Sequence, residues 1–216
     1  MVPLTRRRLL HGASALAIGL AGCTGASSSG SSSSNLPTDA ENVELDPDVV
    51  ALRNTEDEPT VWIGQRPTET HSPTEREPRI TDSEAGLIAS ADRAAQLSFG
   101  DVNGRTEARS FVEATDFETE TILLETRRVA ECYTLELCAV TWSTDDYHTY
   151  FGRTLRPAEV ACETDARDRI SHLVRIPDTL DPGQITSWGS GSSAGSCAKF
   201  KERFERAREQ QQEGDQ

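Results

Sequence analysis

The sequence predicts a mainly β domain of the α+β class: a small antiparallel sandwich or barrel, with two short helices before the main strands and a helix at the C-terminus. The first observation is a series of short β-favouring runs that starts at residue 120 and is interrupted by turn-rich segments at 143–146 and 177–183. The second is the helical spacing of apolar residues in KFKERFERAREQQQ, at 199–212.

The part of the domain before the main strands is expected to begin with a hairpin. Two β-favouring runs, VVALRN at 49–54 and PTVWIG at 59–64, are separated by the turn-forming residues TEDE. Further on, TDSE at 81–84 has the spacing of a capping box, but a strand over 87–89 is an equal alternative there.

Two short helices are expected next. Ser90 is a good cap for a helix over 91–97, and a second helix is predicted over 105–114, after an Asn-Gly turn. The predicted apolar face of the second helix consists of Ala108, Phe111 and Val112.

The main β block contains five predicted strands, at 120–129, 132–142, 147–156, 171–176 and 184–188. Apolar residues alternate along the second of them, because side chains of a strand point to opposite faces in turn. The face expected to pack in the core carries Tyr133, Leu135, Leu137 and Ala139, and the opposite face carries Cys132, Thr134, Glu136 and Cys138. On the C-terminal helix, one face is expected to carry Phe200, Phe204 and Ala207.

Four cysteines lie in this part of the chain, and we expect them to form two disulfides. Cys132 and Cys138 are six residues apart on a predicted strand, about 20 Å, whereas the Cα atoms of a disulfide lie roughly 4.4–6.8 Å apart. These two cysteines therefore cannot pair, and two pairings with Cys162 and Cys197 remain. We favour Cys132–Cys162, because the strand hairpin between them brings the two positions together. Cys138–Cys197 then clasps the C-terminal helix.

The N-terminus has the features of an export signal. A basic head, TRRRLL at 5–10, precedes an apolar run from Leu9 to Gly22. As a helix this run would be about 21 Å long, too short for a hydrocarbon core of about 30 Å. The head, with Arg6 and Arg7, resembles a twin-arginine signal, which serves proteins exported in a folded state.

The apolar run ends in Leu-Ala-Gly-Cys, which resembles a lipobox. The resemblance implies that residues 1–22 are removed and that Cys23 becomes the lipidated first residue of the mature protein. We therefore expect a protein exported by the twin-arginine route and anchored to the outer face of the cytoplasmic membrane, with its domain outside the cell. Oxidised cysteines fit that compartment.

The organisation expected after the signal is a tether followed by one domain. The tether spans 23–42 and is rich in serine, a composition typical of a flexible coil. The disulfide-stapled domain spans 43–216. Within it, 65–79 has three prolines and six charged residues without apolar periodicity, and is expected to be an exposed loop.

The chain is strongly acidic, with a formal net charge of −14. Removal of residues 1–22 takes away three arginines and no acidic residue, so the mature charge is −17. Such a charge repels nucleic acid, which we exclude as a partner. The only lysines are Lys199 and Lys201. An acid-rich, lysine-poor composition suits a solvent of high salt, where charge repulsion is screened.

With its leader, this halophilic composition resembles that of the secreted lipoproteins of haloarchaea. The strand block TDFETETILLETRRVAECYTLELCAVTW at 115–142, with LVRIP at 173–177, also resembles the β-domain of secreted protease-complex subunits. The second resemblance implies an accessory role in a secreted enzyme complex.

The sequence offers one pattern typical of a hydrolase. Gly191 to Gly195 match G-x-S-x-G between a predicted strand and a predicted helix, with Ser193 as the nucleophile. The match lies in the Gly/Ser stretch 189–196, and the last histidine, His172, precedes it in the chain. We therefore interpret 189–196 as a flexible loop and predict no catalytic residues.

Besides hydrolysis, the residue types in the sequence would allow metal binding. His148 stands beside two aspartates, and His71 and His172 are further candidates, but no histidine pair has helical i, i+4 spacing and no CxxC pair exists. We expect His148 to be exposed, and predict no metal and no cofactor. Four aromatic residues near predicted loops could instead contribute to a partner surface: Tyr147, Tyr150, Phe151 and Trp188.

These observations predict a lipid-anchored cell-surface protein that binds a partner and is not an enzyme. Its expected contacts are the membrane, through the lipid on Cys23, and an envelope or secreted protein. The alternatives are an accessory subunit of a secreted protease complex and, less favoured, an extracytoplasmic hydrolase.

Overall fold

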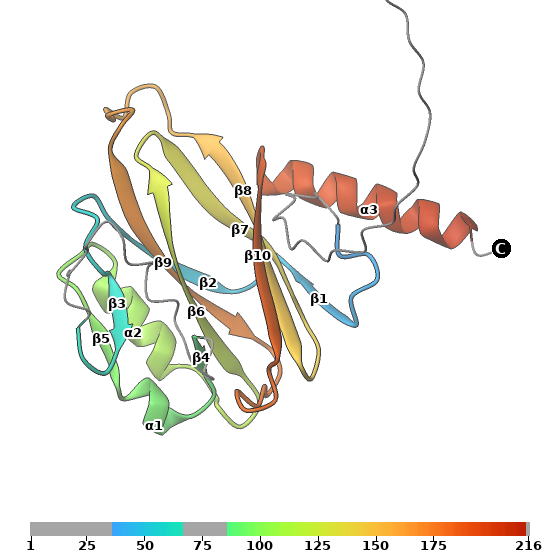
Figure 1. Cartoon of the computed structure of the whole chain (residues 1–216), viewed down its shortest axis with the longest axis horizontal. Helices are drawn as coiled ribbons and strands as arrows, with labels where there is room; N and C mark the ends of the chain where they lie inside the picture. Colours follow the sequence, from blue (N-terminus) through green and yellow to red (C-terminus); the bar gives the residue numbers. More distant parts are fainter. Residues whose placement is uncertain (1–35, 67–85, 215–216) are drawn as a thin grey trace, which may run out of the picture. The chain divides into compact units, whose positions relative to one another are not determined.

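Two four-stranded β-sheets pack face to face (Figure 1). The computed structural model describes residues 36–66 and 86–214, which belong to one compact unit. Sheet A contains, in spatial order, β1 (Asn42–Leu45), β7 (Tyr133–Trp142), β8 (Asp146–Leu155) and β10 (Ser187–Ala194). Sheet B contains, in the same way, β2 (Val49–Asn54), β9 (Arg167–Ile176), β6 (Thr121–Ala130) and β4 (Leu87–Ile88).

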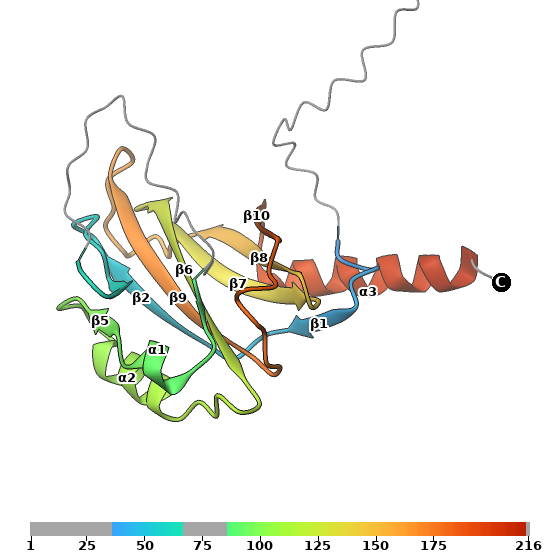
Figure 2. The ribbon, with the colours of Figure 1, turned by 60° about the horizontal axis from the view of Figure 1, so that its bottom comes forward.

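Smaller elements cover the outer faces of both sheets (Figure 2). A two-stranded sheet and two helices lie on sheet B: β3 (Val61–Ile63), β5 (Leu97–Phe99), α1 (Ala91–Ala94) and α2 (Arg105–Glu113). The C-terminal helix α3 (Cys197–Gly214) lies on sheet A. The order of layers is therefore small elements, sheet B, sheet A and α3.

The predicted fold class is confirmed: the domain is mainly β, with two short helices before the main strands and a helix at the C-terminus. The described strands form open sheets and no closed barrel. One strand pair in the described residues departs from the antiparallel expectation, because β10 pairs with β8 in the parallel direction. The predicted hairpin of 49–54 with 59–64 is wrong. β2 pairs with β9 and β3 pairs with β5, although Leu52 of β2 and Val61 of β3 are buried in the same cluster.

The core between the sheets is built from alternate residues of the long strands. Sheet B contributes residues such as Leu123 and Val174, which face each other across β6 and β9. Sheet A contributes Leu137 and Phe151, which face each other across β7 and β8. Burial of this alternating pattern explains why β6, β7, β8 and β9 could be predicted from their sequence, whereas the predicted strand 184–188 overlaps β10 only at Ser187 and Trp188.

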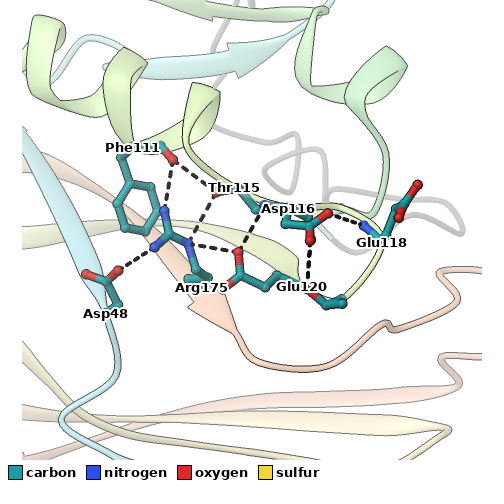
Figure 3. A network of polar contacts seen from close by, with 8 residues as sticks. Asp48, Phe111, Thr115, Asp116, Glu118, Glu120 and Arg175 are labelled. Carbon is teal, nitrogen blue, oxygen red and sulfur yellow. Dashed lines mark hydrogen bonds and ion pairs between the residues drawn. The ribbon is translucent and has the colours of Figure 1, made fainter.

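The helix α2 is held on sheet B by Arg175, which extends from β9 (Figure 3). Its guanidinium donates to the Phe111 carbonyl at 3.0 Å and to the Thr115 hydroxyl at 3.3 Å, and lies 4.3 Å from the centre of the Phe111 ring. It also pairs with Asp48 at 2.7 Å and Glu120 at 3.5 Å. One side chain thus binds the C-terminal end of α2, whose buried residues are the predicted Ala108, Phe111 and Val112.

Helix α3 packs on the outer face of sheet A through Phe200 and Phe204, as predicted, and Ala207 is half-buried. A disulfide joins its first residue, Cys197, to Cys138 of β7. The register of β7 shifts between Leu137 and Ala139, so that Cys138 is a bulged residue.

The bulge changes which residues face the core, and the predicted inward position of Ala139 is therefore wrong. Leu135 and Leu137 lie in the core between the sheets, but Cys138 and Ala139 both lie in the cluster beneath α3. From Val140 onward the alternation resumes with the opposite parity. The sequence could not reveal this change of face. Alternation predicts the inward residues only while each residue of β7 pairs with one residue of β8, and the bulge adds a residue without a partner.

The second disulfide, Cys132–Cys162, joins the turn between β6 and β7 to the loop between β8 and β9. Both favoured pairings are thus present, and Cys132 and Cys138 do not pair. The reason given from the sequence also holds: β7 and β8 form a hairpin in which Tyr133 faces Leu155, so that Cys132 and the loop after Leu155 lie together.

No helix in the described part of the chain is long and apolar enough to cross a membrane. The predicted signal peptide 1–22, Cys23, the segment 81–84 and most of the predicted loop 65–79 lie outside the described residues.

Gly152 of β8 is expected to be essential for the attachment of α3. A Cβ atom at this position would lie 2.7 Å from the Gly195 carbonyl oxygen and 3.0 Å from the Cys138 sulfur. We predict that Gly152→Ala lowers the free energy of unfolding by about 1–3 kcal/mol, as overpacking does, measured by denaturant unfolding under oxidising conditions.

Gly191 of β10 provides the matched control, because no atom lies within 4 Å of the Cβ position there. Gly191→Ala should change the stability by less than about 0.5 kcal/mol. Equal effects of the two substitutions would contradict the tight contact at Gly152.

Candidate functional site

Strand β10 forms one edge of sheet A and is the most unusual surface element of the domain. It pairs with β8 along its whole length, from Ser187 opposite Asp146 to Ala194 opposite Arg153. Among the described strands none pairs with its other side. Its sequence, SWGSGSSA, has no charge and no proline, and most of its residues are exposed.

The structure fixes this Gly/Ser strand at both ends. Before it, the Thr186 amide donates to the Asp145 carbonyl at 2.8 Å. After it, Gly195 has a φ of +116°, which favours glycine, and its amide donates to the Arg153 carbonyl at 3.0 Å before α3 begins. The interpretation of 189–196 as a flexible loop is therefore wrong for 189–194, which form strand because the β8 backbone supplies the partners that their side chains do not.

Gly189 shows why a small residue is needed within β10. A Cβ atom at this position would lie 2.3 Å from Nδ1 of His148, the residue opposite it on β8. His148 is half-buried in β8, so the expectation that it is exposed is wrong. Gly191 has no such neighbour, so nothing in the described chain explains a glycine there. Glycine within a strand often marks the close approach of another backbone or a ligand.

The other edges of the two sheets differ from β10. Edge strands are usually protected by charges, prolines or shortness, because their free backbone groups can pair with another chain. β1 contains Glu44, β2 contains Arg53, and β4 has only two residues. β10 has eight residues and none of these protections.

On the inner side of β10, four polar side chains meet between the sheets. Ser190 and Thr149 place their hydroxyl oxygens 2.5 Å and 2.6 Å from the two carboxylate oxygens of Glu125, and 2.8 Å from each other. Arg127 donates to the Ser190 hydroxyl and lies 3.5 Å from the Glu125 carboxylate. The side chains of Glu125 and Arg127 are 16% and 27% exposed, so this cluster closes the core on the β10 side.

Two aromatic rings connect this cluster to the centre of the core. The Arg127 guanidinium lies 5.1 Å from the centre of the Phe151 ring, which in turn lies 4.9 Å from the His172 ring. His172 is 1% exposed, and neither ring nitrogen forms a hydrogen bond within the described residues. Burial lowers the pKa of His172 to about 4; the backbone of Leu135 opposes this shift and the charge of Arg127 adds to it.

Burial also raises the pKa of the nearby Tyr147, with a further contribution from the charge of Glu125. Neutral His172 and Tyr147 thus border a carboxylate that already accepts from two hydroxyls. Both oxygens of the carboxylate accept a hydrogen bond from sheet A, one of them from Ser190, so the arrangement stabilises β10 from its inner side.

Ser193, the nucleophile of the G-x-S-x-G interpretation, lies within β10 and not at a sharp turn. Its hydroxyl accepts from Arg203 of α3 at 3.3 Å, on the face opposite to Ser190. In the described residues, no three side chains of His, Cys, Asp or Glu gather as potential metal ligands. Cys23, Arg6, Arg7 and His71 lie outside the described residues.

The residues of the inner cluster were not singled out from the sequence. In the sequence, Glu125 and Arg127 look like ordinary polar residues of a strand in which apolar and polar positions alternate. Their role follows from the pairing of β8 with β10, which places Ser190 opposite Thr149. Of the four predicted aromatic partner residues, Trp188 remains 53% exposed at the start of β10, whereas Tyr147 and Phe151 are buried.

Comparisons of the chain with protein-family models, with curated proteins and with solved structures found no match.

His172 should make the stability of the domain depend on pH. Its pKa is about 4 in the folded protein and 6.5 in the unfolded chain. As the pH falls from 6.5 to 4 the unfolded chain takes up a proton that the folded protein does not, so stability is lost by about 3 kcal/mol over this window. Denaturant unfolding at a series of pH values measures the loss.

Since carboxylates also titrate in this range, the comparison variant is His172→Leu, which has no titratable group and a similar volume. Its stability should fall less steeply between pH 6.5 and pH 4 than that of the wild type. Parallel pH profiles of the two proteins would show that His172 is not the group responsible.

Proposed function

We propose that this chain is a lipid-anchored, extracytoplasmic interaction protein without catalytic activity, which binds an extended segment of a partner polypeptide at the free edge of β10. The single observation that carries the proposal is an eight-residue edge strand that is exposed, uncharged and held rigidly from both ends and from its inner side. The signal-like N-terminus supports the location, because the resemblance of 5–10 to a twin-arginine head and of 20–23 to a lipobox implies export and lipidation of Cys23.

Addition of a strand to a sheet edge is a recurring mode of peptide binding. The main-chain hydrogen bonds provide affinity, and pockets or side chains beside the edge provide selectivity. On β10 the exposed Trp188 would be the large apolar contact, since tryptophan is enriched among residues that dominate binding energy. The cluster around Glu125 keeps the strand in place, so little ordering is needed before a partner binds.

A second candidate is an accessory subunit of a secreted protease complex. Its support is the resemblance of 115–142 and 173–177 to the β-domain of such subunits. This candidate uses the same free edge and differs only in what occupies it. The hydrolase alternative has less support, because among the described residues the Ser193 hydroxyl contacts Arg203 and no base.

The lipid anchor is tested by Cys23→Ser. Without the sulfur no lipid can be attached, so the variant should leave the detergent phase and be released into the medium or remain unprocessed. Phase partitioning of cells expressing each protein measures this. Unchanged partitioning of the variant into detergent would refute the anchor, and so would normal lipid labelling.

The binding surface is tested by Gly191→Lys. The side chain has free space on β10, and a lysine at a sheet edge opposes pairing with another strand. We expect cross-linking to envelope proteins in molar salt to fall at least about tenfold for this variant, the equivalent of 1.4 kcal/mol. The control is Ser110→Lys, which adds the same charge on the exposed side of α2. Equal losses in both variants would mean that charge, and not the edge, controls binding.

A further inference from the structure

We infer that the segment which occupies β10 is β10 of a second copy of this chain, paired antiparallel about a two-fold axis at Gly191. The inference rests on the proposed function and names its partner. The product is a continuous eight-stranded sheet made of sheet A from each copy. Four features of the structure favour a second copy.

The first feature is the distribution of charge. Two mature chains of −17 repel each other, and the repulsion is smallest where the contact surface has no carboxylate. From 182 to 198 the chain has no charged residue, and β10 lies at the centre of this stretch. The edges formed by β1 and β2 carry Glu44 and Arg53, with Asp46 and Asp48 beside them. β10 itself is uncharged, and the Glu125 carboxylate beneath it is only 16% exposed and accepts from Ser190 and Thr149, so two acidic bodies meet less repulsion here than at β1 or β2.

The second feature is the fit of β10 to itself. When Gly191 faces Gly191 of the second copy, Ser190 faces Ser192, Gly189 faces Ser193, and Trp188 faces Ala194. Each of these pairs joins residues of the same face, since side chains alternate along a strand. The largest residue of the strand thereby meets the smallest side chain, and two pairs of hydroxyls meet beside it. Facing side chains in a sheet contribute in this way to pairing.

The third feature is the two residues that the isolated chain leaves unexplained. Trp188 is 53% exposed, and pairing would cover it in both copies at once. Gly191 has no atom within 4 Å of its Cβ position, although glycine weakens a strand. In the proposed pairing the two Gly191 residues face each other at the two-fold axis.

The fourth feature is the position of the tether. Leu36, the first described residue, packs in the cluster with Phe200 and Phe204 beneath α3, on the outer face of sheet A. A two-fold axis perpendicular to the joined sheet places the outer faces of both copies on the same side. The two Leu36 residues, at which the described chain begins, then lie on the same side of the joined sheet, which is compatible with two anchors in one membrane. Attachment to one membrane also raises the effective concentration of the partner.

Disulfide cross-linking of Gly191→Cys in full-length, membrane-anchored protein tests the register. Cα atoms that face each other in an antiparallel sheet lie about 4.5 or 5.5 Å apart, within the range of a disulfide of roughly 4.4–6.8 Å. We expect a covalent dimer on a non-reducing gel of oxidised membranes, and the mass of a dimer for the wild type by light scattering in mild detergent.

The matched control is Ser187→Cys, an exposed position on the same strand. In the proposed dimer its two copies lie about 27 Å apart, eight residues along the strands, so it should give no covalent dimer.

A Gly191→Cys protein that cross-links no more than Ser187→Cys, together with a monomer mass for the wild type, overturns the inference. If Gly191→Lys still abolishes cross-linking to other envelope proteins, the proposed function stands and only the second copy is excluded. If Gly191→Lys leaves the cross-linking to envelope proteins unchanged as well, both the inference and the proposed function fail.

Discussion

The disulfide between Cys138 and Cys197 is the constraint on which the rest of the arrangement depends. It fixes the start of α3 against a bulge in β7, and the space around it is so small that Gly152 cannot carry a side chain. Because α3 begins there, the chain must turn at Gly195, and this turn sets where β10 ends. The parallel pairing of β10 with β8 follows from that end point, and with it the free edge that the domain presents.

The parts of the fold that the sequence predicted are those controlled by local patterns. Alternation identified the long strands, Ser90 marked the start of α1 by accepting from the Arg93 amide at 3.2 Å, and the geometry of disulfides excluded Cys132–Cys138. The failures have nonlocal causes. A bulge at Cys138 depends on where its disulfide partner lies, and β10 is a strand only because β8 offers backbone groups to it. Local propensity gives Gly and Ser no reason to form a strand.

The inner cluster could not be predicted for a related reason. Glu125, Thr149 and Ser190 come from three strands, and only the register between sheets brings them together. Burial of a carboxylate is costly unless hydrogen bonds satisfy it. Here the two hydroxyls and Arg127 supply those bonds. Side chains from β6 and β8 thereby hold a strand of weak β-propensity in place, and its outer edge pairs with no other described strand.

The preference for arginine over lysine has a structural reason as well as a solvent-related one. Arginine offers five donors in a fixed plane, whereas lysine offers one charged point. Arg53 uses this capacity on the buried Asp168 and on the carbonyls of Glu131 and Tyr133, at 2.8 and 3.0 Å. Arg175 does the same at α2. A lysine could not form all the hydrogen bonds that Arg53 or Arg175 forms, so part of the arginine preference is set by the fold. These arginines neutralise the acidic side chains that they bind, so the net negative charge is carried by the remaining carboxylates. A contact between two such bodies is then favoured at the neutral edge, where backbone hydrogen bonds replace charge as the source of affinity.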